Sequence, residues 1–269
     1  MRPSALQWAQ PWFSPYAGAQ RALAPHAHLP VVQALQQARP PGGGCPRFVS
    51  QEALAATEPY EAHIHRTGTV PTRDNLHDFF NGLVWLRFPQ AKRRLNELQA
   101  AELAQRGVGP TRGPVRDALT LFDENGAVFE APPALWEALL ARDWQRLFIG
   151  ERALWEQARL LVFGHALMEK LLTGRKDATA HVLLAPPGAV AGVRAGAPSI
   201  APDDAAIAAA LQPDHLAQKP FTPLPILGVP GWCQGNEDFC FYDDPQVFRP
   251  RRRRESTTTK ASARERRTA

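Results

Sequence analysis

The clearest hydrophobic pattern in this chain lies between residues 73 and 92, in the segment RDNLHDFFNGLVWLRFPQAK. Five of its apolar residues follow the i, i+3, i+4, i+7, i+8 spacing of an amphipathic helix. They are Leu76, Phe79, Phe80, Leu83 and Val84. His77, Asn81 and Trp85 recur every four residues on a different side. The pattern predicts a helix with one face in the core and a second side that can line a cleft.

Further helices are predicted on both sides of this segment. Pro89 should interrupt the first helix, because proline lacks the amide proton and disfavours a helical conformation in the preceding residue. The pattern resumes from Gln90 to Arg106 and stops at Gly107. The longest helix is predicted from Glu151 to Leu172. Shorter helices are predicted over residues 30–38, 51–56, 132–141 and 205–211.

Strand signals are fewer, and two of them predict β-hairpins. Residues 60–66 alternate well enough for a short strand, with Thr67-Gly68 as the turn before Thr69-Val70. Residues 118–122 and 127–130 flank the sequence Asp-Glu-Asn-Gly, and an Asn-Gly step between apolar runs favours a hairpin turn. A separate strand is predicted over residues 179–184. In this interpretation Asp123 and Glu124 are turn carboxylates that serve turn geometry and solvation.

These elements predict an α+β fold, a predominantly α-helical single domain with one or two short β-hairpins. We expect the domain to span residues 1–250, with loops near 39–46 and 186–204, where proline and glycine gather. Residues 221–250 are rich in both proline and aromatic residues. Such a segment is unsuited to a central strand, so an extended Pro-rich wrap over the domain is predicted.

Charge separates the end of the chain from the rest. The net charge is +5 over 269 residues, but residues 249–269 carry eight Arg and one Lys against two Glu, a net +7 that leaves −2 for residues 1–248. Residues 251–269 are therefore expected to form a basic disordered tail, removable without unfolding the domain, that contacts nucleic acid weakly by counterion release. No long apolar run or secretory signal is visible, which favours a cytoplasmic protein without a membrane span.

Several familiar catalytic classes lack their motifs. The chain has no GxxxxGK[ST], no GxGxxG after a strand, no HExxH and no GxSxG. These absences argue against P-loop nucleotide hydrolysis, Rossmann cofactor binding, zincin proteolysis and α/β-hydrolase chemistry. The three cysteines also lack the spacing of a zinc finger.

The candidate chemistry therefore lies in scattered polar residues. His77, Asp78 and Asn81 combine imidazole, carboxylate and amide groups that suit divalent metal binding or general acid-base catalysis. Adjacent helical residues diverge by about 100°, so His77 and Asp78 need not face one site. Arg112 and Arg116 could bind a phosphate or a carboxylate in a bidentate manner, or simply pair with Asp117 and nearby acids. The structural alternative is that these polar residues cap and crosslink neighbouring backbone.

His165 is the second histidine of interest. It lies on the apolar stripe of its predicted helix, with Glu169 one turn later. A histidine in such a position is often a hydrogen-bonded core residue, but a nearby carboxylate on the same helix is similar to metal sites inside helical bundles. The sequence therefore suggests one divalent metal held by His77, Asp78 and His165.

Five ordered segments carry a resemblance to a known family. They are the helix of residues 73–92 together with RDALTLFDENG (116–126), FGHALMEKL (163–171), PLPILGVPGW (223–232) and FYDDPQVFRP (241–250). Over residues 12–250 the chain resembles the domain-of-unknown-function family DUF3025. The resemblance implies a cytoplasmic bacterial protein and supplies no activity, cofactor or partner.

Two functions from different classes follow from these residues. The first is a metal-dependent hydrolase, phosphohydrolase-like, in which His77, Asp78, Asn81, Arg116 and Asp117 are the catalytic candidates. The alternative is a non-catalytic binding or scaffold protein whose polar cluster holds the core in register and whose tail touches nucleic acid. Convergence of His77, Asp78, Asp117 and His165 in space would discriminate between the two.

Overall fold

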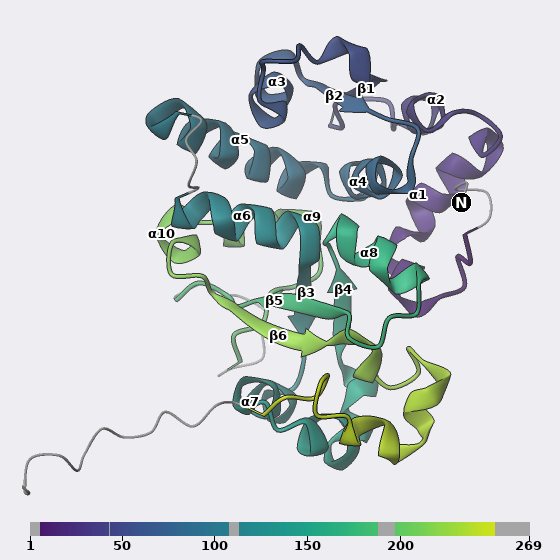
Figure 1. Cartoon of the computed structure of the whole chain (residues 1–269), viewed down its shortest axis with the longest axis vertical. Helices are drawn as coiled ribbons and strands as arrows, with labels where there is room; N and C mark the ends of the chain where they lie inside the picture. The colour runs from purple at the N-terminus through teal and green to yellow at the C-terminus, as the bar shows by residue number, and fades with distance from the viewer. Residues whose placement is uncertain (1–5, 43, 108–112, 188–196, 251–269) are drawn as a thin grey trace, which may run out of the picture.

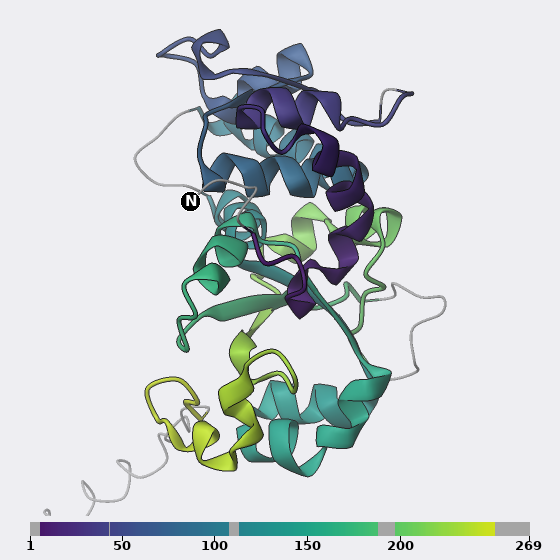
Figure 2. The ribbon, with the colours of Figure 1, turned by 90° about the vertical axis from the view of Figure 1, so that its right-hand side faces the viewer.

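The computed structural model describes residues 6–42, 44–107, 113–187 and 197–250. Within these ranges helices dominate, and the strands form one two-stranded and one four-stranded sheet. The prediction of a mainly helical α+β fold is confirmed. The expected tail, residues 251–269, lies outside the described residues, as does Arg112. Figures 1 and 2 show the elements stacked along the longest axis of the molecule, with the four-stranded sheet between layers of helices.

The helices are α1 (Ala17–Leu23), α2 (Val31–Gln37), α3 (Tyr60–Thr67), α4 (Leu76–Arg87), α5 (Pro89–Arg106), α6 (Pro114–Asn125), α7 (Pro133–Ala141), α8 (His165–Leu172), α9 (Asp204–Ala210) and α10 (Pro213–Leu216). The strands are β1 (Arg47–Ser50), β2 (Thr69–Thr72), β3 (Gly126–Glu130), β4 (Arg159–Val162), β5 (Thr179–Leu183) and β6 (Phe221–Pro225). None of the helices in the described ranges is both long enough and apolar enough to cross a bilayer.

Helices α4 and α5 follow the predicted pattern. The side chain of Asn75 accepts a hydrogen bond from the backbone amide of Asp78, which caps the start of α4. Pro89 is the first residue of α5, where its missing amide proton does no harm, and the preceding Phe88 leaves the helical region. Gly107, at φ 70°, follows the last residue of α5. The break therefore turns one apolar stretch into two helices with different directions.

The first predicted hairpin, over residues 60–70, is wrong. Residues 60–67 form α3, and the buried Ile64 lies one turn after Tyr60. Gly68, at φ 63°, ends this helix in the left-handed conformation instead of forming a hairpin turn. Strand β2 then pairs in parallel with β1, which precedes α3 in the chain. Tyr60 and Ile64 have the i, i+4 spacing of a helix, and this spacing decided the structure over the short alternating pattern.

The second predicted hairpin, around Asn125-Gly126, is also wrong. Residues 114–125 form α6, whose buried side chains have helical spacing: Val115, Ala118, Leu119 and Phe122. Gly126 has a φ of −73° and is the first residue of β3, so helix passes into strand without an intervening loop. β3 is central in the sheet order β4-β3-β5-β6. It pairs antiparallel with β4 and parallel with β5, far along the chain.

The predicted long helix from Glu151 to Leu172 is wrong as well. Residues 152–157 form a 3-10 helix, β4 follows, and α8 begins only at His165. The apolar run Leu160-Leu161-Val162 pairs with β3, so sheet formation overrides the helical pattern. The helix predicted over residues 51–56 is a single 3-10 turn, Gln51–Ala53.

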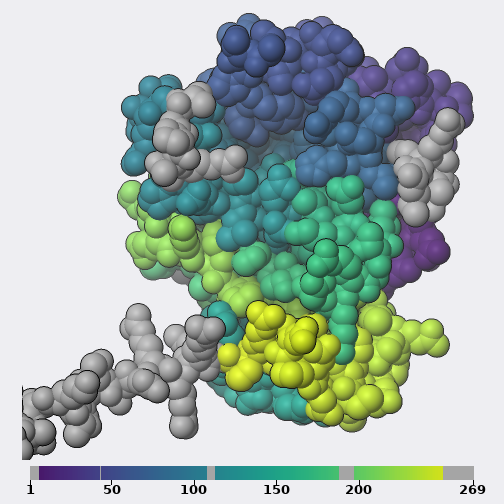
Figure 3. Space-filling model, in the orientation of Figure 1, coloured from purple at the N-terminus to yellow at the C-terminus, as the bar shows by residue number. Residues whose placement is uncertain are grey.

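The proline-rich carboxy-terminal segment begins as β6 at an edge of the sheet, a position where proline is tolerated. Beyond it the chain runs through short 3-10 turns that pack on the body. The ring of Tyr242 stacks on Phe148 at 5.3 Å, and Trp232 lies 6.0 Å from Trp12. Figure 3 shows this segment, in yellow, covering the surface of one end of the molecule.

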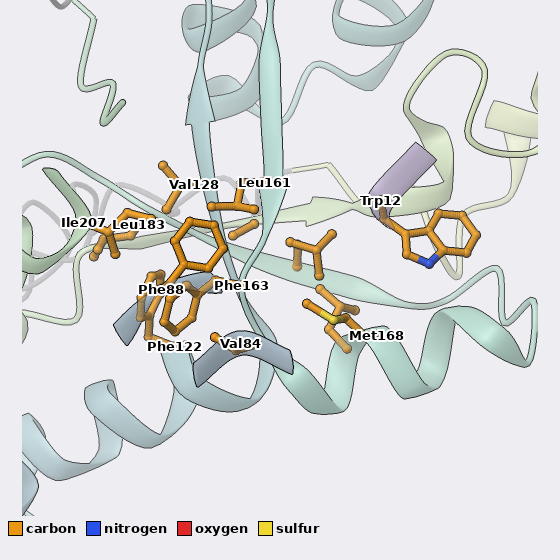
Figure 4. Packing of buried hydrophobic residues seen from close by; sticks show 14 of the residues in the cluster. Trp12, Val84, Phe88, Phe122, Val128, Leu161, Phe163, Met168, Leu183 and Ile207 are labelled. Carbon is orange, nitrogen blue, oxygen red and sulfur yellow. The ribbon is translucent and has the colours of Figure 1, made fainter. Parts of the chain in front are cut away.

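The core lies where α4, α6 and α8 pack on the four-stranded sheet. Phe122 of α6 stacks on Phe163 at 4.6 Å between the ring centroids, and Phe163 lies 5.8 Å from Phe88 (Figure 4). All three rings are fully buried. This aromatic packing fixes the end of α6 against the start of α8, which positions the site described next.

Candidate functional site

The ends of three helices meet beside the sheet. His77 lies in the first turn of α4, Glu124 in the last turn of α6, and His165 is the first residue of α8. Helix α8 packs against both α4 and α6. The close approach depends on Gly164, because a Cβ there would lie 2.5 Å from the carbonyl oxygen of Glu124 and 2.6 Å from the amide nitrogen of Asn125. A larger residue would push α8 away from α6.

The two histidine side chains face each other. Their Nε2 atoms are 3.1 Å apart, and the rings meet edge to face with centroids 4.5 Å apart. Nδ1 of His165 donates a hydrogen bond to the backbone carbonyl of Asp123 at 2.8 Å, and Nδ1 of His77 donates to Glu169 at 3.4 Å. In the tautomer that donates from Nδ1, each ring directs the lone pair of its Nε2 atom at the other ring. A proton on one Nε2 atom, or a metal ion between the two nitrogens, accounts for this separation.

Glu124 adds a carboxylate to the pair. Its Oε1 lies 3.8 Å from Nε2 of His165, and one ligand atom each from His77, Glu124 and His165 lie within 4.8 Å of one another. For a metal–nitrogen distance of about 2.0–2.1 Å, two nitrogens 3.1 Å apart subtend an angle of about 100° at the ion. That angle lies between octahedral and tetrahedral values. The spacing therefore fits a common divalent ligand set of two imidazoles and one carboxylate.

Burial affects His165 and Glu124 differently, because it favours the neutral imidazole and opposes ionisation of the carboxylate. Burial lowers the pKa of His165 to about 4, so its ring is neutral near pH 7. Burial and the charge of Asp123 raise the pKa of Glu124, while the neighbouring His77 opposes that shift. A neutral imidazole with its second nitrogen held by an acceptor is the form in which histidine binds metals.

A buried polar network supports the pair from behind. Nζ of Lys92 lies 2.5 Å from Oδ1 of Asp123 and donates to Oδ1 of Asn81 at 2.8 Å. Burial would raise the pKa of Asp123, but Lys92 and His165 hold it below its usual value. Asn81 in turn donates to the hydroxyl of Tyr60 at 3.0 Å. Asn81, a predicted catalytic residue, is thus placed in this buried network and not beside the opposed nitrogens.

Asp78 occupies a different position from the one expected for a metal ligand. Its carboxylate accepts hydrogen bonds from the backbone amide of Arg73 at 2.6 Å and from the guanidinium of Arg73 at 2.9 Å. These bonds fix the start of α4. Of the three predicted metal ligands, the structure brings His77 and His165 together, and Glu124 completes the group.

Asp117 and Arg116 lie further along α6. Asp117 pairs with Lys219 at 3.6 Å, and both line a hollow of about 360 Å³ that Glu124 also lines. Arg116 acts on the buried Glu61, whose pKa it lowers against a larger effect of burial. Its Nε is buried without an acceptor in the described ranges. Asp117 therefore shares a hollow with Glu124 but not with either histidine, whereas Arg116 faces elsewhere.

Sequence reasoning missed four residues of this arrangement: Lys92, Asp123, Glu124 and Glu169 in its role toward His77. Asp123 and Glu124 were assigned to a hairpin turn, which removed them from the candidates. The helical spacing from Val115 to Phe122 carried the signal that they end a helix. Glu169 was considered only with His165 of its own helix, but it contacts His77 on α4.

One comparison with known proteins gives a match. The model of a family described as "Protein of unknown function (DUF3025)" matches residues 46–252. No curated protein and no solved structure matches the chain.

Proposed function

Because this chain belongs to the DUF3025 family, a family of unknown function, we propose from the site alone that it is a metal-dependent hydrolase. In this proposal His77, His165 and Glu124 hold one divalent ion. His77 and His165 were expected to do so from the sequence, and Glu124 takes the place of Asp78. The substrate class is an anionic ester, with a phosphoester the best fit to the surroundings.

The observation that carries the proposal is the pair of opposed Nε2 atoms, 3.1 Å apart, with both Nδ1 atoms already engaged. Histidine ligands in metal sites usually donate their second ring nitrogen to a carboxylate or a backbone carbonyl. Here the carboxylate of Glu169 is the partner of His77, and the backbone carbonyl of Asp123 is the partner of His165. Such partners fix the ring orientation before an ion binds, so little rearrangement is required.

Exposure and ligand number favour a catalytic over a purely structural ion. The side chains of His77 and Glu124 are 36% and 35% exposed, whereas His165 is 5% exposed. Structural zinc sites use four protein ligands, while catalytic sites use three and leave a position for water or substrate. A divalent ion lowers the pKa of a bound water and so supplies a nucleophile near neutral pH.

The hollow beside Glu124 is lined by one cation, Lys219, and by the carboxylates of Asp117 and Glu124, so an anionic substrate there would be held by Lys219 and by the proposed ion. Lys219 lines it in a left-handed conformation, φ 52°, which is unusual for a residue other than glycine and is often found at functional sites. The water oxygen would form a bond to phosphorus as the bond to the leaving oxygen breaks. One water proton ends on the leaving oxygen, and the other stays on the phosphate. Lys219 would hold the phosphoryl oxygens, and Asp117 would position Lys219.

Elemental mass spectrometry of the purified full-length protein tests the metal site. We expect close to one divalent ion per chain after incubation with Zn²⁺ or Mn²⁺ and gel filtration, and loss of that ion in His77→Ala and Glu124→Gln. The matched control is His28→Ala, which removes an exposed histidine on another part of the surface and should retain the ion.

Activity is then measured on chromogenic phosphomonoesters and phosphodiesters. Metal-dependent turnover that falls at least 100-fold in His77→Ala, but not in His28→Ala, would support the hydrolase. A metal-free protein whose stability does not respond to divalent ions would overturn it. That result would favour the non-catalytic scaffold, in which a proton joins the two histidines.

A further inference from the structure

A second hollow, of about 400 Å³, lies beside the carboxy-terminal part of α4, where Trp85 lines it. It lies among residues from the segment before β1, from β1 itself, and from α3, α4 and α5. The residues that matter for its chemistry are Arg39, Cys45, Arg47, His65, Trp85 and Arg93. None of them belongs to the histidine site described above.

The charge of this hollow is strongly positive. Within the described ranges, no carboxylate pairs with Arg39, Arg47 or Arg93. Arg39 and Arg93 each donate one hydrogen bond, at 2.7 Å, to a backbone carbonyl of the loop before β1. Glu97 also lines the hollow, but its carboxylate lies 3.9 Å from Arg94. Three arginines therefore line one hollow without a carboxylate partner among the described residues, with Arg47 and Arg93 exposed to solvent and Arg39 half-buried beside the Cys45 thiol.

Two buried donors on residues that line this hollow have no acceptor in the described part of the chain. They are Nε1 of Trp85 and Nε of Arg39, neither of which has a hydrogen-bond partner among the described residues. Trp85 is 3% exposed. A buried N–H group without an acceptor is unfavourable and in native proteins usually indicates a bound water, an ion or a functional role. Here both orphan donors belong to residues that line the arginine-rich hollow.

We propose that this hollow is a binding site for the phosphate group of a small phosphorylated molecule. A phosphate offers three terminal oxygens with several lone pairs, which suits planar guanidinium groups that bind in a bidentate manner. A lone carboxylate, with two oxygens, would leave more of these donors unused. The volume exceeds what a phosphate alone fills, so it also accommodates part of the attached molecule.

The site is separate from the proposed metal centre. His77 and Trp85 are eight residues apart on α4, which corresponds to a rise of about 12 Å. One phosphate cannot reach both ends of that distance. The proposal therefore does not depend on the hydrolase, and it is tested in the His77→Ala variant as well as in the unaltered chain.

The experiment is a titration of ¹⁵N-labelled full-length protein with inorganic phosphate, followed through the indole N–H signals in NMR spectra. The signal of Trp85 is assigned from its absence in Trp85→Phe. We expect this signal to shift in a saturable way with phosphate and not with chloride at equal ionic strength. Arg47→Gln and Arg93→Gln should each weaken binding at least fivefold. The control Arg21→Gln removes an equal charge from the exposed surface of α1 and should leave binding unchanged.

Three outcomes would overturn the proposal. The first is an unshifted Trp85 signal, and the second is equal weakening by Arg21→Gln and Arg47→Gln, which would indicate nonspecific attraction. The third is much tighter binding of single-stranded RNA than of phosphate, with a steep salt dependence, which would assign the hollow to a nucleic-acid surface. Saturable phosphate binding that persists in His77→Ala supports a site independent of the metal centre.

Discussion

Lys92 and Asp123 form a buried ion pair, with Nζ and Oδ1 2.5 Å apart, in the layer directly behind the histidine site. Their side chains are 5% and 17% exposed. The backbone carbonyl of Asp123 also accepts the hydrogen bond that orients His165. Residue 123 therefore contributes twice, because its backbone holds a histidine and its side chain holds a lysine. The ion pair connects α5 to the end of α6 that carries Glu124.

Removal of one partner should destabilise the fold strongly. Lys92→Met leaves the carboxylate of Asp123 buried without its countercharge, and we expect the free energy of unfolding to fall by about 3–5 kcal/mol. Urea unfolding followed by circular dichroism measures the change. The exposed pair of Arg175 and Asp177 is the control, since water screens this pair and Arg175→Met should change stability far less than Lys92→Met does. Similar small effects in both variants would contradict a structural role for Lys92.

Gly164→Ala should separate the two histidines. The new Cβ would clash with the backbone of Glu124 and Asn125, which cannot move aside as a flexible side chain can. We expect a loss of about 1–3 kcal/mol in stability together with weaker metal binding. Gly18→Ala in α1 is the matched control, because the new Cβ would lie 4.0 Å from Nη2 of Arg21, an ordinary van der Waals distance. That change should leave stability equal or raise it by about 0.4–1 kcal/mol, and thermal unfolding would detect the difference.

Glu169→Ala tests the orientation of His77. The variant removes the carboxylate that accepts from Nδ1 of His77 without removing any proposed ligand. We expect divalent metal affinity, measured by competition with a chromophoric chelator, to drop about 10–100-fold. Glu156→Ala removes an exposed carboxylate elsewhere and should have no such effect. Unchanged affinity in Glu169→Ala would show that His77 is oriented by other contacts.

Glu61 predicts a pH dependence of stability. Burial and the charge of Asp123 raise its pKa above the ordinary value of 4.5, although Lys92 and a hydrogen bond from Asn96 oppose the shift. A raised pKa in the folded state means that the protonated form favours folding. This contribution is complete below the unfolded pKa and is lost as pH rises through the folded pKa.

Glu61→Gln removes this titration and retains an oxygen that can accept from Asn96. Relative to the unaltered protein, the variant should therefore gain stability as pH rises from about 4 toward neutrality. Urea unfolding at a series of pH values measures the difference between the two proteins. A difference that stays constant with pH, or grows in the opposite direction, would show that the folded pKa of Glu61 is not raised.

The sequence predicted the helices whose burial pattern is regular and whose ends carry strong signals. Helices α4 and α5 are examples, because the Asn75 cap and Pro89 mark their boundaries locally. Both predicted hairpins were wrong because short apolar runs fit the helical period as well as the strand period. Contacts with residues distant in sequence determine which of the two forms. The apolar run at residues 160–162 joins β3 across the chain, which no local pattern records.

The histidine site was predictable only in part. His77 and His165 were selected for their residue types and helix faces, yet they are 88 residues apart, and their opposition depends on the packing of α4 on α8. Glu124 was lost because the secondary structure around it was misassigned. Asp78 was favoured because it neighbours His77, but the helical turn directs it toward Arg73. Proximity in sequence was therefore a poor guide to proximity in space.

The direct passage of α6 into β3 at Gly126 gives the site an asymmetric stiffness. Glu124 lies two residues before the central strand, whose backbone is paired on both sides, so this carboxylate cannot shift without disturbing the sheet. Among the described residues, His77 lies in the first turn of its helix and its ring contacts the side chains of Glu169 and His165, with no strand directly beside it in the chain. We therefore expect any accommodation of ions of different radius to come from the α4 side, with α6 acting as the fixed reference.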